Sequence, residues 1–231
     1  MKQKQLKIES IPAILWGEPS EKLYLYIHGQ NGNKEEAEAF SKIICLKGWQ
    51  VLSCDLPEHG ERTAESDTFN PWHVVPELRR IMRYTQTNWS KIALYANSIG
   101  VWFCMLSLAD EPLENCLFVS PILDMERLIT NMMKWAGVTE PQLKKEQIIP
   151  TNFGQTLSWK YLEYTRKNPI TKWAIPTIIL YADKDNLTEY CVIDDFVKRF
   201  HCRLTVMENG EHWFHTPEQL AVLEQWIKNN Y

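Results

Sequence analysis

The feature of this chain that most constrains its fold is an alternation of short apolar runs with amphipathic stretches, from residue 23 to residue 230. The apolar runs have the composition of buried strands, and the amphipathic stretches carry apolar residues at helical spacing. Alternating strands and crossover helices favour a mostly parallel sheet covered by helices on both faces, so the predicted fold class is α/β. The predicted strands are residues 23–29, 49–57, 91–96, 116–120, 176–182 and 202–208, and the predicted helices are residues 34–48, 71–88, 98–110, 189–200 and 217–230.

One long segment interrupts this alternation. Residues 122–172 contain no convincing strand but two helical patterns, at residues 124–137 and 157–169. Because a crossover between parallel strands needs only one helix, the segment is too long for an ordinary connection. We therefore predict a single domain over residues 1–231, in which residues 122–172 form a small helical cap at the carboxyl edge of the sheet.

Composition excludes several classes of protein. The 231 residues carry a net charge of −4 and no long basic run, which disfavours a nucleic-acid or membrane-surface partner. No apolar stretch is long enough for a signal peptide or a membrane span, so we expect a cytoplasmic protein. The six cysteines form no CxxC pair and several lie in apolar runs, so they are interpreted as structural thiols rather than zinc ligands or disulfides. A monomer and a homodimer both remain open.

A serine stands where a predicted strand turns directly into a predicted helix. In "ALYANSIG", Ser98 is flanked two positions away by the small residues Ala96 and Gly100. Small residues at these positions allow the helix to pack closely on the sheet, so that Ser98 projects from the apex of the turn. The alternative is that Ser98 merely caps the following helix, a position that serine favours.

This segment resembles the G-x-S-x-G nucleophile elbow of the α/β-hydrolase family, with Ala96 in place of the first glycine. In this family the acid and then the histidine follow the nucleophile along the chain. The resemblance implies that Ser98 is the nucleophile and that Asp185, in "ILYADKDNLT", is the acid. Asp183 and Asp124 remain alternatives for the acid.

The same resemblance implies that His212 is the catalytic base. Thr216 and Pro217 predict the start of the last helix, because threonine is a good N-cap and proline fits the first helical turn. This start leaves His212 in the preceding loop, and His215 is interpreted as its packing neighbour. The two histidines lack a third ligand, so no metal site is predicted.

A glycine-containing loop follows the first of these predicted strands. "YIHGQNGN" resembles the family's His-Gly loop, which implies that the backbone N–H groups of Gln30 and Ile99 form the oxyanion hole. A simple glycine-containing turn would explain the same residues equally well. His28, on the strand side of this turn, is interpreted as structural.

"DLPEHGER" resembles a second loop of the family, of the pattern Asp-x-x-Gly-x-Gly, with Glu58 where glycine is common. Asp55 and His59 in this segment are interpreted as residues that shape the loop.

The resemblance implies a serine hydrolase that cleaves a small ester through an acyl-enzyme, as a carboxylesterase does, without a cofactor. Met132, Trp135 and Trp159 are predicted to line a substrate pocket, although such residues can also simply bury the cap against the sheet. The fold also hosts thioesterases, amidases, carbon–carbon hydrolases and non-catalytic ligand-binding proteins, and these stay as alternatives. The natural substrate is not predicted.

Overall fold

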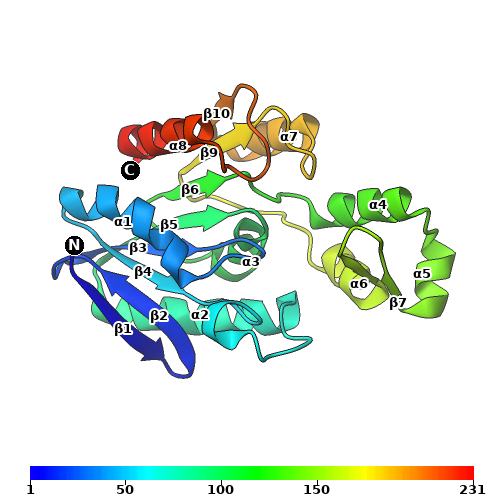
Figure 1. Cartoon of the computed structure of the whole chain (residues 1–231), viewed down its shortest axis with the longest axis horizontal. Coiled ribbons are helices and arrows are strands. Elements are labelled where there is room, and N and C mark those ends of the chain that lie inside the picture. Colours follow the sequence, from blue (N-terminus) through cyan, green and yellow to red (C-terminus); the bar gives the residue numbers. More distant parts are fainter.

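A computed structural model describes all of residues 1–231, and its centre is an eight-stranded sheet (Figure 1). The strand order is β1-β2-β4-β3-β5-β6-β9-β10. In this order, each strand from β4 onward is parallel to the next one in the sheet. The predicted α/β fold class with a mostly parallel sheet is confirmed. The strands are β1 (Gln3–Ile8), β2 (Ile11–Trp16), β3 (Lys22–Ile27), β4 (Gln50–Cys54), β5 (Lys91–Asn97), β6 (Cys116–Val119), β9 (Thr177–Ala182) and β10 (Arg203–Met207).

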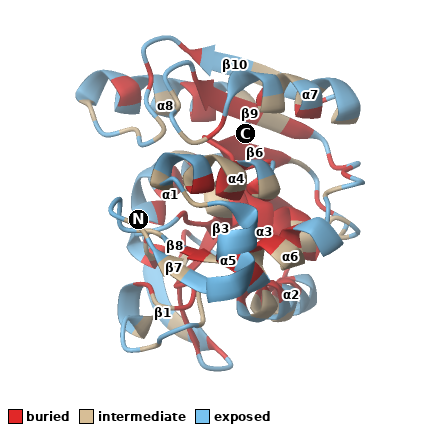
Figure 2. Cartoon of the chain, turned by 90° about the vertical axis from the view of Figure 1, so that its right-hand side faces the viewer, coloured by how far each residue is buried: buried red, intermediate tan, exposed pale blue.

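Helices cover both faces of the sheet, as expected for crossover connections. Strand β3 shows why: Leu23 and Leu25 belong to one buried cluster, whereas Tyr24 and Tyr26 belong to another on the opposite face. Figure 2 shows these buried strands between helices whose outer surfaces are exposed. One cluster takes side chains from α1 (Ala37–Ile44) and α8 (Pro217–Asn230), and the other from α2 (Pro71–Asn88), α3 (Ile99–Leu108) and α7 (Tyr190–Phe200).

The predicted helix at residues 34–48 consists of three consecutive pieces. The 3-10 turns η1 (Lys34–Glu36) and η2 (Cys45–Lys47) flank α1, and Gly48 ends the last turn with φ of 77°. This φ lies in the left-handed region that glycine enters without steric cost, which is why glycine closes so many helices.

The N-terminal hairpin was not predicted. Strands β1 and β2 pair antiparallel, from Gln3 with Trp16 to Ile8 with Ile11, and β2 joins the sheet beside β4. Strand β1 lies at the edge of the sheet and most of its residues are exposed, including Lys4 and Lys7. Charged residues on an edge strand prevent pairing with other chains, but they also remove the apolar signal that marks a buried strand.

The segment predicted as a cap lies beyond the carboxyl ends of the parallel strands (Figure 1). The prediction that it lacks strands was wrong, since a two-stranded hairpin and an additional helix accompany the two expected helices. The additional helix α5 buries only Leu143, and each hairpin strand has three residues, so neither carries a periodic apolar pattern. The elements are α4 (Met125–Ala136), α5 (Glu140–Glu146), β7 (Ile148–Pro150), β8 (Thr156–Ser158) and α6 (Trp159–Lys167).

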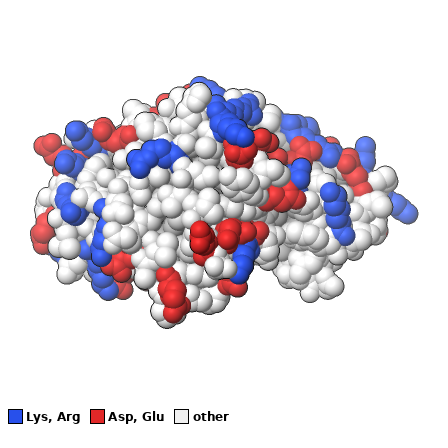
Figure 3. All heavy atoms as spheres, turned by 90° about the horizontal axis from the view of Figure 1, so that it is seen from above, with Lys and Arg blue, Asp and Glu red and all other residues white.

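The surface carries charges of both signs. On the face shown in Figure 3, acidic and basic side chains are interspersed. None of the helices combines the length and the apolarity needed to cross a membrane.

Candidate active site

The strand-to-helix turn at Ser98 has an unusual backbone. Ser98 adopts φ of 51° and ψ of −124° between β5 and α3, a region that non-glycine residues seldom occupy. Such strain persists only where the surroundings enforce it. Here the N–H of Ser98 donates to the carbonyl of Val119 (3.0 Å), and the Ser98 carbonyl accepts from the N–H of Ile122 (3.1 Å). The turn is therefore held against the end of β6.

Gly100 permits this turn to approach the neighbouring strand. A Cβ atom at Gly100 would lie 2.5 Å from the carbonyl oxygen of His28, far inside contact distance. The close packing at this position is thus made against the end of β3, and not against the strand that precedes the serine as predicted. Any side chain at residue 100 would push α3 away from the His28–Gly29 segment.

A continuous chain of hydrogen bonds joins Ser98, His212 and Asp185. The Oγ of Ser98 lies 2.8 Å from Nε2 of His212, and Nδ1 of His212 lies 2.7 Å from Oδ2 of Asp185. Because a carboxylate only accepts, Nδ1 carries the proton and donates to Asp185, which leaves Nε2 free to accept from the serine hydroxyl. This arrangement can remove a proton from Ser98.

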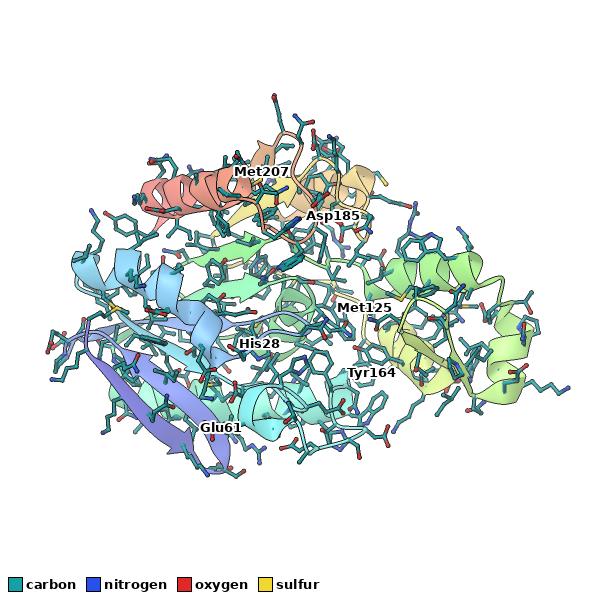
Figure 4. All side chains as sticks on the ribbon, in the orientation of Figure 1. His28, Glu61, Met125, Tyr164, Asp185 and Met207 are labelled. Atoms are coloured by element: carbon teal, nitrogen blue, oxygen red, sulfur yellow. The ribbon has the colours of Figure 1, made fainter.

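Two loops bring the acid and the histidine together. Asp185 follows β9 and His212 follows β10, and these adjacent parallel strands end at the same edge of the sheet. The N–H of Lys184 donates to the carbonyl of Gly210 (3.0 Å), which joins the two loops directly. Figure 4 shows Asp185 at the side of the sheet that faces the cap.

The structure separates the three carboxylates considered for the acid. The side chain of Asp185 is fully buried, and its Oδ1 accepts from the N–H groups of Leu187 (2.8 Å) and Thr188 (2.9 Å). Asp183 is exposed and forms no hydrogen bond or ion pair with His212. Asp124 caps α4, where its side chain accepts from the N–H of Arg127 (2.9 Å). Only Asp185 faces the histidine.

The two backbone amides predicted for the oxyanion hole border Ser98. Ile99 is the first residue of α3, so its N–H has no partner within the helix. Gln30 follows Gly29, whose Cβ, if present, would lie 3.0 Å from the Cβ of Ser98. The N–H of Gln30 has no acceptor in the protein. Both amides can therefore take an oxygen of a ligand.

A buried ion pair lies next to this loop. Nζ of Lys34 contacts Oδ2 of Asp55 at 2.8 Å, and both side chains are almost fully buried. Burial alone would lower the pKa of Lys34, but the carboxylates of Asp55, Glu61 and Glu35 outweigh it and raise the pKa. Asp55 also accepts from the backbone N–H of Lys34 and of Glu61 (2.9 and 3.0 Å). Asp55 therefore joins the loop after β4 to the start of η1.

The predicted pocket residues of the cap lie in different environments. Trp159 is buried under Lys144, whose Nζ lies 5.5 Å from the ring centroid. Trp135 is 51% exposed and packs edge to face on Phe153. Met132 is half-buried against the main core. Their part in binding a substrate stays a prediction.

One cavity lies between α4, α7 and the end of α6. Its volume is about 370 Å³, and Trp102 and Leu123 line it together with side chains of α4, α7 and the end of α6. None of Ser98, Asp185 and His212 lines it. No group of three His, Cys, Asp or Glu side chains is arranged to hold a metal ion.

One contact between the cap and the predicted oxyanion loop was missed. Nε2 of Gln30 donates to Oε1 of Gln155 (3.3 Å), which lies in the turn of the β7–β8 hairpin. The two glutamines are 125 positions apart and belong to loops, so no periodic pattern links them. The hairpin therefore reaches across to the loop beside Ser98.

Comparisons with known proteins agree with this architecture. No protein-family model and no curated protein matches the chain. Among solved structures, Est1E from Butyrivibrio proteoclasticus is 17% identical with a TM-score of 0.74, covering 98% of this chain and 96% of its own. Mouse alpha/beta hydrolase domain-containing protein 10 is 13% identical, with a TM-score of 0.75 and coverage of 99% and 98%. The thioesterase domain from the curacin biosynthetic pathway is 16% identical, with a TM-score of 0.64 and coverage of 98% and 99%. The chain has the α/β-hydrolase fold, as its elbow and loop motifs predicted.

Proposed function

We propose that this protein is a serine hydrolase that cleaves small esters through a covalent acyl-enzyme. The observation that carries the proposal is the unbroken hydrogen-bond chain from Ser98 through His212 to Asp185. A serine hydroxyl is a weak nucleophile until an adjacent base takes its proton, and this chain supplies both the base and the group that orients it.

The first half of the proposed reaction forms the acyl-enzyme. His212 takes the proton of Ser98 as the serine oxygen attacks the ester carbonyl carbon. The carbonyl oxygen becomes an oxyanion and receives hydrogen bonds from the N–H groups of Gln30 and Ile99. One such donor contributes about 2.7–4 kcal/mol to stabilising the transition state. The intermediate then collapses, and the leaving alcohol takes the proton from His212.

The second half reverses these roles with water. His212 removes a proton from a water molecule, which attacks the acyl carbon, and the carboxylic acid leaves as Ser98 recovers its proton. Asp185 remains ionised throughout and stabilises the imidazolium that forms in each half. These steps require no cofactor.

The similarity to the curacin thioesterase domain favours thioesters as a second class of substrate. A thioester would pass through the same tetrahedral intermediate and would differ only in its leaving group. Est1E has been seen with ferulic acid bound, which makes an aromatic acyl group a useful member of a substrate panel.

The test is hydrolysis of p-nitrophenyl esters of graded acyl length, together with an aromatic ester and matched thioester and amide analogues. We expect the wild-type protein to hydrolyse short esters and Ser98→Ala to lose about 10⁴-fold or more in kcat. Turnover retained by Ser98→Ala would exclude this mechanism. A folded wild-type protein inactive on the whole panel would favour a non-catalytic ligand-binding role.

A further inference from the structure

The loop that carries Gln30 is a tight turn. The N–H of Gly32 donates to the carbonyl of Gly29 (3.2 Å), which closes the turn around Gln30 and Asn31. Asn31 has φ of 64°, in the left-handed region that asparagine tolerates better than most residues. The turn has few internal bonds, so its conformation depends on neighbouring segments.

His59 contacts this turn from the loop that follows β4. Nε2 of His59 lies 2.9 Å from the backbone nitrogen of Asn31, and Nδ1 lies 2.7 Å from the carbonyl oxygen of Pro57. A backbone N–H can only donate and a carbonyl can only accept. The ring is therefore neutral, with its proton on Nδ1, and it accepts the N–H of Asn31 at Nε2.

The backbone and neighbours of His59 hold its ring in place. The preceding residue, Glu58, has φ of 66°, and its carboxylate accepts from the N–H groups of Thr68 and Phe69. His59 is only 8% exposed, and the ring centroids of His28 and Phe69 lie 5.2 and 4.4 Å from that of His59. A packed ring with both nitrogens bonded is a fixed acceptor.

We propose that His59 is a positioning residue for catalysis: it fixes the peptide that follows Gln30, and thereby keeps the Gln30 N–H beside Ser98 as an oxyanion donor. This role rests on the proposed function, because the donor matters only if an oxyanion forms at Ser98. His59 acts through the backbone of Asn31 and does not touch the substrate. Removing its acceptor therefore weakens stabilisation of the transition state more than binding of the substrate.

Two substitutions separate this acceptor from the rest of the side chain. In His59→Asn the amide reaches the place of Nδ1 and can still bond to Pro57, but nothing replaces Nε2. In His59→Gln the longer amide can present an oxygen where Nε2 lies. His73→Phe is the control, since His73 is an exposed histidine on α2 whose Nδ1 lies 2.8 Å from the side chain of Asn70.

The experiment measures kcat and KM with a p-nitrophenyl ester and checks folding by circular dichroism. We expect His59→Asn to lower kcat by about 10- to 100-fold with KM changed less than about threefold, because an oxyanion donor is misplaced rather than deleted. His59→Gln should recover kcat to within about threefold of wild type, and His73→Phe should match wild type. If His59→Asn does not fold, His59→Phe fills the ring volume without an acceptor and should show the same loss of kcat.

Two results would overturn the inference in different ways. Equal kcat in wild type and a folded variant without the acceptor, or an equal loss in His59→Asn and His59→Gln, would refute the role of His59 alone. Absence of turnover by the wild type would refute the proposed function and this role with it.

Discussion

The carboxylate of Asp185 lies 2.7 Å from Nδ1 of His212 and is completely shielded from solvent. Its second oxygen accepts two backbone N–H groups, from Leu187 and Thr188, so the carboxylate cannot rotate away from the ring. This pairing holds His212 with its Nε2 directed at Ser98. The orientation of the imidazole therefore depends on Asp185 more than on any other side chain.

Replacing the carboxylate should disable the base without disturbing the fold. We expect Asp185→Asn to lower kcat for ester hydrolysis by about 10³- to 10⁴-fold, because the amide favours the wrong tautomer of His212. Asp183→Asn, two residues away and exposed, should stay within about threefold of wild type. Steady-state kinetics of the two variants test this ranking, and the reverse order would assign the acid to Asp183.

The ion pair between Lys34 and Asp55 should contribute strongly to stability. We expect Lys34→Met to lower the free energy of unfolding by about 3–5 kcal/mol, because it leaves the Asp55 carboxylate buried without its cation. Lys42→Met removes the same side chain from an exposed pair with Glu38 and should cost less than about 1 kcal/mol. Urea unfolding at neutral pH measures both, and similar small losses would mean that the buried pair is not stabilising.

His28 should make the protein sensitive to acid. Burial lowers the pKa of His28 from 6.5 to about 4, so the unfolded chain takes up a proton at a higher pH than the folded protein does. Stability is therefore intact above about pH 6.5 and falls by up to about 3 kcal/mol as the pH drops to about 4.

Urea unfolding at about pH 7.5 and about pH 4 should show a smaller drop for His28→Gln than for wild type, because glutamine does not titrate. His201→Gln is the control, since that histidine is exposed and ends α7. An equal drop in His28→Gln and wild type would show that other groups cause the acid sensitivity.

The sequence predicted the helices that bury one face and the central strands that bury both faces, because burial imposes a regular pattern of apolar residues. The helix at residues 71–88 was predicted with the bounds of α2, and in the structure Asn70 caps its start and Pro71 is its first residue. The turn at Ser98 was also predicted, because the hydrophobic period changes there and the flanking residues Ala96 and Gly100 are small.

Elements without a regular pattern of apolar residues could not be predicted from the sequence. Strand β1, helix α5 and the β7–β8 hairpin are short or largely exposed, so few of their residues are constrained to be apolar. The contacts of Gln30 with Gln155 and of Asn31 with His59 join loops distant in sequence, and in the second contact the bonded group of Asn31 is a backbone N–H. Every residue except proline has a backbone N–H, so the residue type at position 31 does not indicate this hydrogen bond. The sequence motif therefore predicted only a loop-shaping role for His59.

Covalent labelling of Ser98 by a fluorophosphonate tests the central claim most directly. The reagent reacts with a serine only when a neighbouring base activates it, and mass spectrometry of a digest identifies the modified residue. We predict a single adduct on Ser98 in wild type, abolished in Ser98→Ala and strongly slowed in His212→Ala. A folded wild-type protein that stays unlabelled, or an adduct on a different serine, would contradict the proposal that Ser98 is an activated nucleophile.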